Sequence, residues 1–306
     1  MDRDFLTLDE ITPRELDQLL ELAAKVKASP GDFASRLAGR SVALIFEKPS
    51  TRTRVSFEVG VASMGGHAVV LSSQDLQLGR GETIEDTGRV LSRYVDAIVL
   101  RTFGQERLEN LAAAATVPVV NALSDYEHPC QILADLLTVR ERKGDLAGRT
   151  LAYLGDGNNV AHSLLLGGAK AGMSTRVATP PGYEPIPQVV QRAEQIAADT
   201  GGTVEVTNDP GVAATGADAL YTDVWASMGQ EAEQAERVLV FAPYRLDTDK
   251  VERARDDAIV LHCLPAHRGE EITTDVIDGP HSVVWDQAEN RLHTQKALLL
   301  WLLGAA

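Results

Sequence analysis

The sequence has little cysteine and no long apolar run. Cys130 and Cys263 are the only cysteines among 306 residues, so a disulfide-dense scaffold is excluded, although one disulfide could form. No stretch reaches the roughly 18 consecutive apolar residues that a transmembrane helix needs. The opening M-D-R-D-F-L-T-L-D-E lacks the basic and then apolar order of a secretory signal. These absences predict a cytoplasmic protein.

Basic residues are also scarce. The 29 lysines and arginines stand against 44 acidic residues, which gives a net charge of −15. A broad basic surface for nucleic acid or an anionic membrane is therefore not expected. Such a chain would also repel a small anionic ligand, unless the ligand's site concentrated cations locally.

Short apolar runs alternate with segments of helical periodicity along the whole chain. Strands are predicted at 42–46, 68–71, 96–100, 117–120, 150–154, 174–178, 203–207, 218–222, 237–241, 258–262 and 282–285. Helices are predicted at 13–27, 82–94, 105–115, 129–142, 160–171, 187–199 and 290–303. This alternation is typical of parallel sheets with helices on both faces, and eleven strands are many for one sheet. We therefore predict an α/β protein with two doubly wound parallel-sheet domains packed together.

The domain boundary is predicted in K-G-D-L-A-G-R at 143–149, after a long helical segment and before a new strand. The first domain would comprise 1–143 and the second 144–289. A C-terminal helix at 290–306 would return to complete the first domain.

The densest group of cations is E-K-P-S-T-R-T-R at 47–54, directly after an apolar run. If a strand ends near Phe46 and a helix begins near Ser50, the first backbone N–H groups of that helix favour an anion. Arg52 adds a planar guanidinium suited to phosphate oxygens. The motif has no glycine and is not a P-loop. A solvated helix cap is the alternative, and spacing alone does not separate the two.

The alternating valines from Val55 onward would also suit a strand, but a glycine pair beyond them favours a helix.

Polar residues follow two more predicted strands of the first half. Arg101 comes directly after one strand, and H-P-C-Q at 128–131 follows another. Carboxyl ends of parallel strands share one edge of a sheet, where open α/β folds bind ligands. Together with Arg52, these residues predict one anion-binding pocket.

The second half has two polar strand ends of its own. Asp223 begins D-V-W-A-S-M-G after one predicted strand, and Cys263 lies in H-C-L-P after another. The carboxylate of Asp223 could bind an ammonium group. In contrast, L-G-D-G-N-N at 154–159 lacks the third glycine of a dinucleotide fingerprint, which disfavours a nicotinamide oxidoreductase.

The motifs S-T-R-T-R-V-S-F-E, H-P-C-Q, D-x-x-x-S-M-G and H-C-L-P together resemble the transcarbamoylases, and in particular their ornithine branch, over nearly the whole chain. The resemblance implies transfer of a carbamoyl group from carbamoyl phosphate to L-ornithine, by amine attack on the carbamoyl carbon. The products would be L-citrulline and phosphate, in arginine biosynthesis, with no metal or organic cofactor. It also implies a homotrimer, or a multiple of trimers, with active sites at subunit interfaces.

The resemblance assigns roles to the residues at matching motif positions. The carbamoyl-phosphate site would comprise Ser50, Thr51, Arg52, Thr53, Gln77, Arg101, His128, Pro129, Cys130, Gln131, Cys263, Leu264 and Arg291, with Gln77 supplied by a neighbouring subunit. The ornithine site would comprise Asn159, Asp223, Ser227 and Met228. The catalytic residues would be Arg52, Arg101, His128, Gln131, Asp223 and Cys263.

Three alternatives stay open. A related carbamoyltransferase could use putrescine or an acylated ornithine, although putrescine has no carboxylate for an intact S-M-G loop to bind. A non-catalytic binding paralogue would be expected to have lost motif residues, and none is missing here. A structural zinc bound by His128, Cys130, His262 and Cys263 is disfavoured, because adjacent strand residues point to opposite faces and no C-x-x-C pair occurs.

Overall fold

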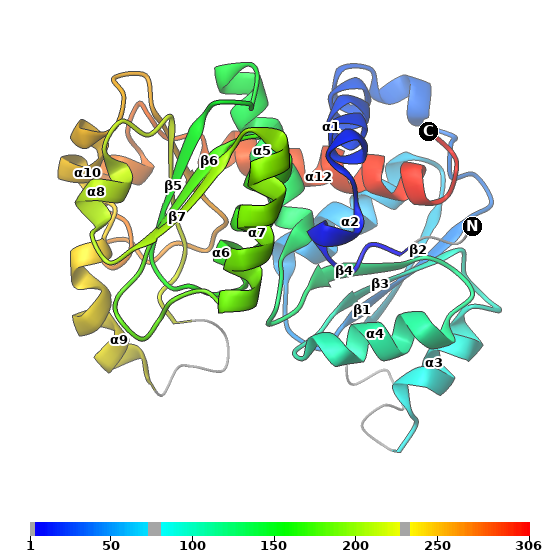
Figure 1. The fold of residues 1–306 in the computed structure, drawn as a ribbon. Coiled ribbons are helices and arrows are strands. Elements are labelled where there is room, and N and C mark those ends of the chain that lie inside the picture. The colour runs from blue at the N-terminus through cyan, green and yellow to red at the C-terminus, as the bar shows by residue number, and fades with distance from the viewer. Residues whose placement is uncertain (1–3, 73–80, 227–232) are drawn as a thin grey trace. The chain divides into compact units, whose positions relative to one another are not determined.

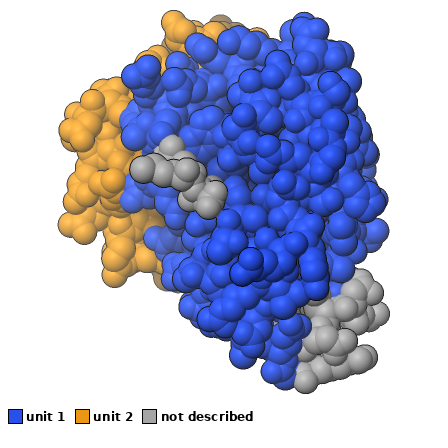
Figure 2. Space-filling view, turned by 90° about the vertical axis from the view of Figure 1, so that its right-hand side faces the viewer, with its two compact units in different colours: residues 1–134, 289–306 blue, residues 135–288 orange. Residues whose placement is uncertain are grey.

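The computed structural model describes residues 4–72, 81–226 and 233–306. The chain divides into two compact units, coloured separately in Figure 2. Unit 1 comprises Met1–Ala134 and Glu289–Ala306, and unit 2 comprises Asp135–Ala288. Each unit contains one parallel sheet with helices on both sides of it (Figure 1). The prediction of two parallel-sheet α/β units is confirmed.

The sheet of unit 1 has four strands in the order β2-β1-β3-β4. Their bounds are β1 (Ser41–Phe46), β2 (His67–Ser72), β3 (Ala97–Arg101) and β4 (Val119–Leu123). The helices that begin in this unit are α1 (Pro13–Ala28), α2 (Thr51–Ser63), α3 (Ile84–Leu91), α4 (Gln105–Ala114) and α5 (Pro129–Lys143), with short 3₁₀ turns η1 (Leu8–Glu10) and η2 (Pro30–Phe33). Apolar residues of α3 and α4, such as Ile84 and Leu108, pack on Ala43 and Ile98 of the sheet. This packing holds the strands whose carboxyl ends carry the polar motifs.

The segment after the first strand is a helix, as predicted. Ser50 is the N-cap of α2, and its hydroxyl oxygen accepts a hydrogen bond from the backbone N–H of Thr53 at 3.3 Å. Val55 and Val59 are about half exposed, whereas Phe57 and Gly60 are buried. Val55 and Val59 therefore lie on the solvent side of the helix, whereas Val61 is buried, so the alternating residues do not share one face as they would in a strand.

The sheet of unit 2 has five strands in the order β7-β6-β5-β8-β9. Their bounds are β5 (Thr150–Leu154), β6 (Ser174–Ala178), β7 (Thr203–Thr207), β8 (Ala219–Thr222) and β9 (Ile259–His262). The other elements are α6 (Asn159–Lys170), α7 (Pro187–Thr200), α8 (Pro210–Ala214), α9 (Gln234–Phe241), η5 (Ala242–Tyr244), α10 (Thr248–Arg253) and α11 (Thr274–Ile277). In Figure 1, α6 and α7 lie on one side of this sheet and α8 and α10 on the other.

Two strand predictions are wrong. The run at 237–241 belongs to helix α9, in which Arg237 and Phe241 are buried while Leu239 is exposed. A continuous apolar run does not reveal that the buried residues, Arg237 and Phe241, are four positions apart, as on one face of a helix. Near 282–285 the chain forms only an isolated bridge from Ser282 to Val260 before α12 (Val284–Leu302) begins. Residues 297–300 of α12 are buried, whereas its last two residues, Trp301 and Leu302, are partly exposed.

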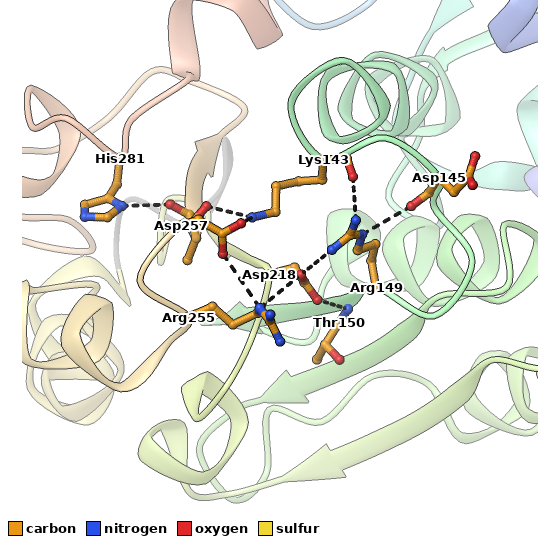
Figure 3. A network of polar contacts seen from close by, with 9 residues as sticks. Lys143, Asp145, Arg149, Thr150, Asp218, Arg255, Asp257 and His281 are labelled. Atoms are coloured by element: carbon orange, nitrogen blue, oxygen red, sulfur yellow. Dashed lines mark hydrogen bonds and ion pairs between the residues drawn. The ribbon is translucent and has the colours of Figure 1, made fainter.

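Charged residues gather at the amino edge of the unit 2 sheet (Figure 3). Asp218, just before β8, accepts hydrogen bonds from the backbone N–H of Thr150 at 2.9 Å and from Arg149 at 3.1 Å. Lys143 donates to the carbonyl oxygen of Asp257 at 2.7 Å, and its ion pair lowers the pKa of the Asp257 carboxyl. These contacts join the starts of three strands, at the edge opposite the predicted site. We interpret them as structural.

None of the described helices is both long and apolar enough to cross a membrane.

Candidate active site

The predicted anion-binding residues of unit 1 lie at the carboxyl edge of its sheet. Phe46 and Arg101 are paired at the ends of β1 and β3, and the backbone N–H of Glu47 donates to the carbonyl of Arg101 at 2.9 Å. Ser50 caps the helix that follows β1, and His128 immediately precedes α5, which follows β4. Three separate strand ends therefore contribute to one edge, as the sequence motifs predict.

Arg291 connects this edge to the end of the chain. Its Nη2 donates to Oγ1 of Thr53 at 3.0 Å, and its Nη1 donates to Oε1 of Gln131. All three side chains are buried. The first turns of α2 and α5 are thus held by one guanidinium from α12, within unit 1.

The electrostatic environment of His128 identifies the centre of this group. Burial lowers the pKa of His128 well below its ordinary value, and nearby Arg291, Arg101 and Arg52 lower the pKa further. The imidazole is therefore neutral at pH 7, with one N–H to donate. Three guanidinium groups around a neutral donor suit an anion with a carbonyl group beside it. The acidic chain does concentrate cations locally.

The remaining residues of the motif surround this group. Thr51 and Arg52 are exposed at the start of α2, and Pro129 is the first residue of α5. Pro at this position needs no backbone hydrogen bond, so the helix begins without an unsatisfied donor there.

Cys130 is the second residue of α5 in the same unit. Its thiol is buried and donates to the carbonyl oxygen of Asn121 at 3.3 Å. Burial raises the pKa of the Cys130 thiol to about 12, against the opposing effect of Arg291. A thiol with this pKa stays protonated at neutral pH and is a poor nucleophile.

The other two cationic residues of the 47–54 motif, Lys48 and Arg54, are engaged with neighbouring side chains. The Lys48 ammonium lies 2.5 Å from Oδ1 of Asp125 and 4.2 Å from the centre of the Phe103 ring. Arg54 forms an exposed ion pair with Glu58 at 3.5 Å along α2. Lys48 is thus engaged in contacts with the loops after β3 and β4, whereas Arg54 pairs only along its own helix.

In unit 2, Asp223 and Cys263 come together at the carboxyl edge of the sheet. They directly follow the neighbouring strands β8 and β9, whose last residues are paired. The Cys263 thiol donates to Oδ1 of Asp223 at 2.8 Å, and Asp223 is buried, with 6% of its surface exposed. The next residue, Leu264, has a φ of +57°. A positive φ is rare for a bulky residue other than glycine, so the turn after Cys263 is strained.

The expectation that His262 and Cys263 point apart is wrong. Ligand atoms of Asp223, His262 and Cys263 all lie within 4.8 Å of one another. Cys263 lies beyond the last residue of β9, so the alternation of faces along a strand does not apply to it. His262 is fixed by its own contacts, since Nδ1 accepts from the backbone N–H of Leu264 at 2.8 Å and Nε2 lies 3.1 Å from Oε1 of Glu271.

Asn159 is the half-buried first residue of α6, near the end of β5. The residue before it, Asn158, caps the helix, with its Oδ1 accepting from the N–H of Val160 at 2.9 Å. Gln77, Ser227 and Met228 lie outside the described residues.

The sequence does not predict two ion pairs near the site. Glu47 accepts hydrogen bonds from Arg107, at 3.0 Å from Nε, and from the hydroxyl of Thr102, next to Arg101. No local signal links positions 47 and 107. Asp156 accepts from Arg237 at 2.8 Å, and burial raises the pKa of its carboxyl while Arg237 opposes that rise. The position of Asp156 in L-G-D-G, directly after a predicted strand, is the sequence feature that could have marked it as a residue near the site.

Family models and known proteins match both units. Residues 3–141 match the model described as "Aspartate/ornithine carbamoyltransferase, carbamoyl-P binding domain", and residues 147–302 match the "Asp/Orn binding domain" of the same family. An ornithine carbamoyltransferase from Parafrankia sp. is 66% identical over 304 residues, covering 98% of this chain and 96% of that protein. One from Acidothermus cellulolyticus is 63% identical over 308 residues, covering 100% and 98%.

Solved structures agree. That of ornithine carbamoyltransferase from Pyrococcus furiosus has a TM-score of 0.96 to this chain at 56% identity, covering 99% of this chain and 97% of the other. That of the Gloeobacter violaceus ornithine carbamoyltransferase has a TM-score of 0.90 at 51% identity, covering 98% of each chain. The chain therefore belongs to the aspartate/ornithine carbamoyltransferase family, and it is an enzyme of the carbamoyltransferase class.

Proposed function

We propose that this chain is an ornithine carbamoyltransferase, which converts carbamoyl phosphate and L-ornithine to L-citrulline and phosphate. The observation that carries the proposal is the group of guanidiniums around the buried, neutral His128. A site of this kind suits a phosphate joined to a polar carbonyl group. Ornithine as the second substrate is supported by the names of the relatives that are 66% and 63% identical.

We further propose that residues 1–143 with 290–306 bind carbamoyl phosphate and that residues 144–289 bind ornithine. The descriptions of the two family models support this assignment. In the first region, Ser50, Thr51, Arg52, Thr53 and Arg101 would hold the phosphate, while His128 and Gln131 would hold the carbamoyl group. The bond from Arg291 orients the Gln131 amide for that role.

Attack by the amine converts the carbamoyl carbon to a tetrahedral centre with negative charge on its oxygen. Arg52 and the neutral imidazole of His128 would donate to that oxygen. Loss of one donor of this kind typically lowers the rate about 10²- to 10³-fold. Arg52 and Arg101 would also stabilise the phosphate as it leaves, because charge accumulates on its oxygens.

The second substrate would be bound by Asn159, Asp223, Ser227 and Met228. Asp223 is suited to hold the amine, because its carboxylate already accepts a bond from Cys263 and is fixed in place. Part of the rate enhancement would come from holding the amine and the carbamoyl carbon close together in the orientation for attack. The proposal includes a homotrimer in which Gln77 reaches a neighbouring subunit, a biosynthetic direction in arginine metabolism and a cytoplasmic location, all of which rest on family resemblance.

The proposal is tested by giving the purified protein carbamoyl phosphate with L-ornithine, putrescine or an N-acylated ornithine in separate reactions. We expect equal amounts of citrulline and phosphate with ornithine alone. Product with putrescine or the acylated amine but not with ornithine would contradict the substrate assignment. No product with any amine would instead favour a non-catalytic paralogue. The Arg52→Ala variant serves as the control for contaminating activity.

A further inference from the structure

A second group of potential ligands lies in the segment that follows β9. His267, Glu270 and Glu271 each offer one ligand atom, and these atoms lie within 4.8 Å of one another. A turn brings the first two together, since the backbone N–H of Glu270 donates to the carbonyl of His267 at 2.9 Å and Gly269 has φ +91°. Nδ1 of His267 lies 3.9 Å from Oε2 of Glu270.

Glu271 distinguishes this group from an ordinary surface cluster. Its side chain is fully buried. One carboxylate oxygen, Oε1, lies 3.1 Å from Nε2 of His262 and accepts the backbone N–H of His267 at 2.5 Å. The other oxygen, Oε2, is buried and has no hydrogen-bond partner among the described residues. A buried carboxylate oxygen without a partner is unfavourable and requires an explanation.

The unpartnered oxygen faces the other members of the group. Oε2 of Glu271 lies 3.8 Å from Nδ1 of His267. Two metal–ligand bonds of about 2.1 Å span at most about 4.2 Å, so one ion can contact both atoms. The His267 and Glu270 side chains are 46% and 34% exposed, and therefore have room to adjust and leave the ion a route from solvent.

We propose that His267, Glu270 and Glu271 form a binding site for a late first-row divalent cation such as Zn²⁺. One imidazole nitrogen and two carboxylate oxygens would bind the ion, and water would fill the remaining position. Imidazole favours Zn²⁺, Ni²⁺ and Co²⁺ over Mg²⁺ or Ca²⁺, which prefer oxygen ligands alone. The contacts of Glu271 Oε1 with His262 and with the backbone N–H of His267 would orient the Glu271 carboxylate for metal binding.

This site differs from the group formed by Asp223, His262 and Cys263. That second group contains the thiol, whereas the proposed site has no sulfur ligand. Direct contact of the His267 ring with the two carboxylates, with no ion between them, is the competing explanation, and direct metal binding distinguishes the two.

The test uses the full-length protein, stripped of metal and carrying Cys263→Ser so that the thiol cannot bind the ion. Titration calorimetry with Zn²⁺ is expected to give one ion per chain. Adding His267→Ala or Glu270→Gln is expected to weaken binding about tenfold or more. Both residues are partly exposed, so these variants should fold normally, which circular dichroism would verify. His67→Ala, at an exposed histidine of β2, is the matched control and should bind as the parent does.

Two further measurements make the outcome decisive. Zn²⁺ should raise the melting temperature of the Cys263→Ser protein, because an ion that binds the folded state stabilises it, and this rise should vanish with His267→Ala. Co²⁺ in place of Zn²⁺ should give visible absorption bands that also vanish with His267→Ala. The proposal is overturned if the Cys263→Ser protein binds no Zn²⁺ at millimolar concentration. Equal binding by the His267→Ala, Glu270→Gln and His67→Ala variants would overturn it as well.

Discussion

The thiol of Cys263 donates a hydrogen bond to Oδ1 of Asp223, with 2.8 Å between sulfur and oxygen. The two residues follow neighbouring parallel strands, β9 and β8, so the sheet itself sets their separation. Asp223 is buried, with 6% of its surface exposed. A carboxylate fixed at a strand end in this way is prepared to accept a second donor, such as the amine of a substrate.

Asp223→Asn should weaken the use of ornithine without unfolding the protein. The amide keeps the shape of the side chain but loses the charge that would hold the amine. A hydrogen bond to a charged group contributes about 1.5–3 kcal/mol, so kcat/KM for ornithine should fall about 10- to 100-fold. Steady-state kinetics with both substrates varied would measure this fall. Asp209→Asn, at the exposed N-cap of α8 where Asn caps equally well, is the control. An unchanged kcat/KM for ornithine would exclude Asp223 from the site.

Arg52→Ala should remove most activity while leaving stability nearly unchanged, because the side chain is exposed at the start of α2. Arg52 would stabilise both the tetrahedral oxygen and the leaving phosphate, so we expect kcat/KM to fall by about 10² or more. Arg54→Ala, two residues further along the same helix, removes only an exposed pair with Glu58 and should keep near-normal activity. If Arg52→Ala retains more than about a tenth of the parent kcat/KM, Arg52 does not contact the substrate.

The two cysteines should differ in reactivity. Cys130 is fully buried with a pKa of about 12, whereas Cys263 is partly exposed. Iodoacetamide at pH 8 should therefore alkylate Cys263 alone in the folded protein and both residues in denaturant. Peptide mass spectrometry would identify the modified residue. Rapid modification of Cys130 in the folded protein would mean that the start of α5 opens.

The low pKa of His128 should make stability depend on pH. The unfolded chain binds a proton at this residue near pH 6.5, whereas the folded protein binds it only at lower pH. Stability from this group is therefore complete above about pH 6.5 and falls as the pH drops toward the folded pKa. Melting temperatures at pH 5.5 and 7.5 should differ more for the parent than for His128→Gln. Other histidines are common to both proteins, so equal differences would mean that His128 is not a buried neutral base.

The sequence predicts both parallel sheets and most helices, because strand and helix periodicities are local. It also predicts that Arg101, His128 and the Ser50 motif reach one sheet edge, since this follows from parallel topology. It does not predict that Arg291 bonds to Gln131, 160 positions earlier, because no local pattern records such a pairing. The strand wrongly predicted at 237–241 has a related cause. Burial by the surrounding tertiary structure decides whether a short apolar run forms a strand or a helix.

The bond between Arg107 and Glu47 leads to a prediction about residues that do not contact the substrate. Glu47 is joined to Arg107 of α4 and to Thr102, so it connects the end of β1, just before the Ser50 motif, to the residue after Arg101. Arg107→Gln should remove the bonds that fix the Glu47 carboxylate to α4. Only the Thr102 hydroxyl and the backbone bond from Glu47 to Arg101 would then connect the two phosphate-binding segments, which should be held less rigidly.

We expect Arg107→Gln to raise KM for carbamoyl phosphate several-fold, with a smaller change in kcat and in KM for ornithine, because only phosphate binding depends on the connection. Arg107→Lys keeps the charge and should restore part of the affinity, although it lacks the two-pronged geometry of arginine. Arg89→Gln is the matched control, since Arg89 forms an exposed pair with Asp86 at 2.7 Å on the neighbouring helix α3. An equal KM for carbamoyl phosphate in Arg107→Gln and Arg89→Gln would show that Glu47 holds the site without help from Arg107.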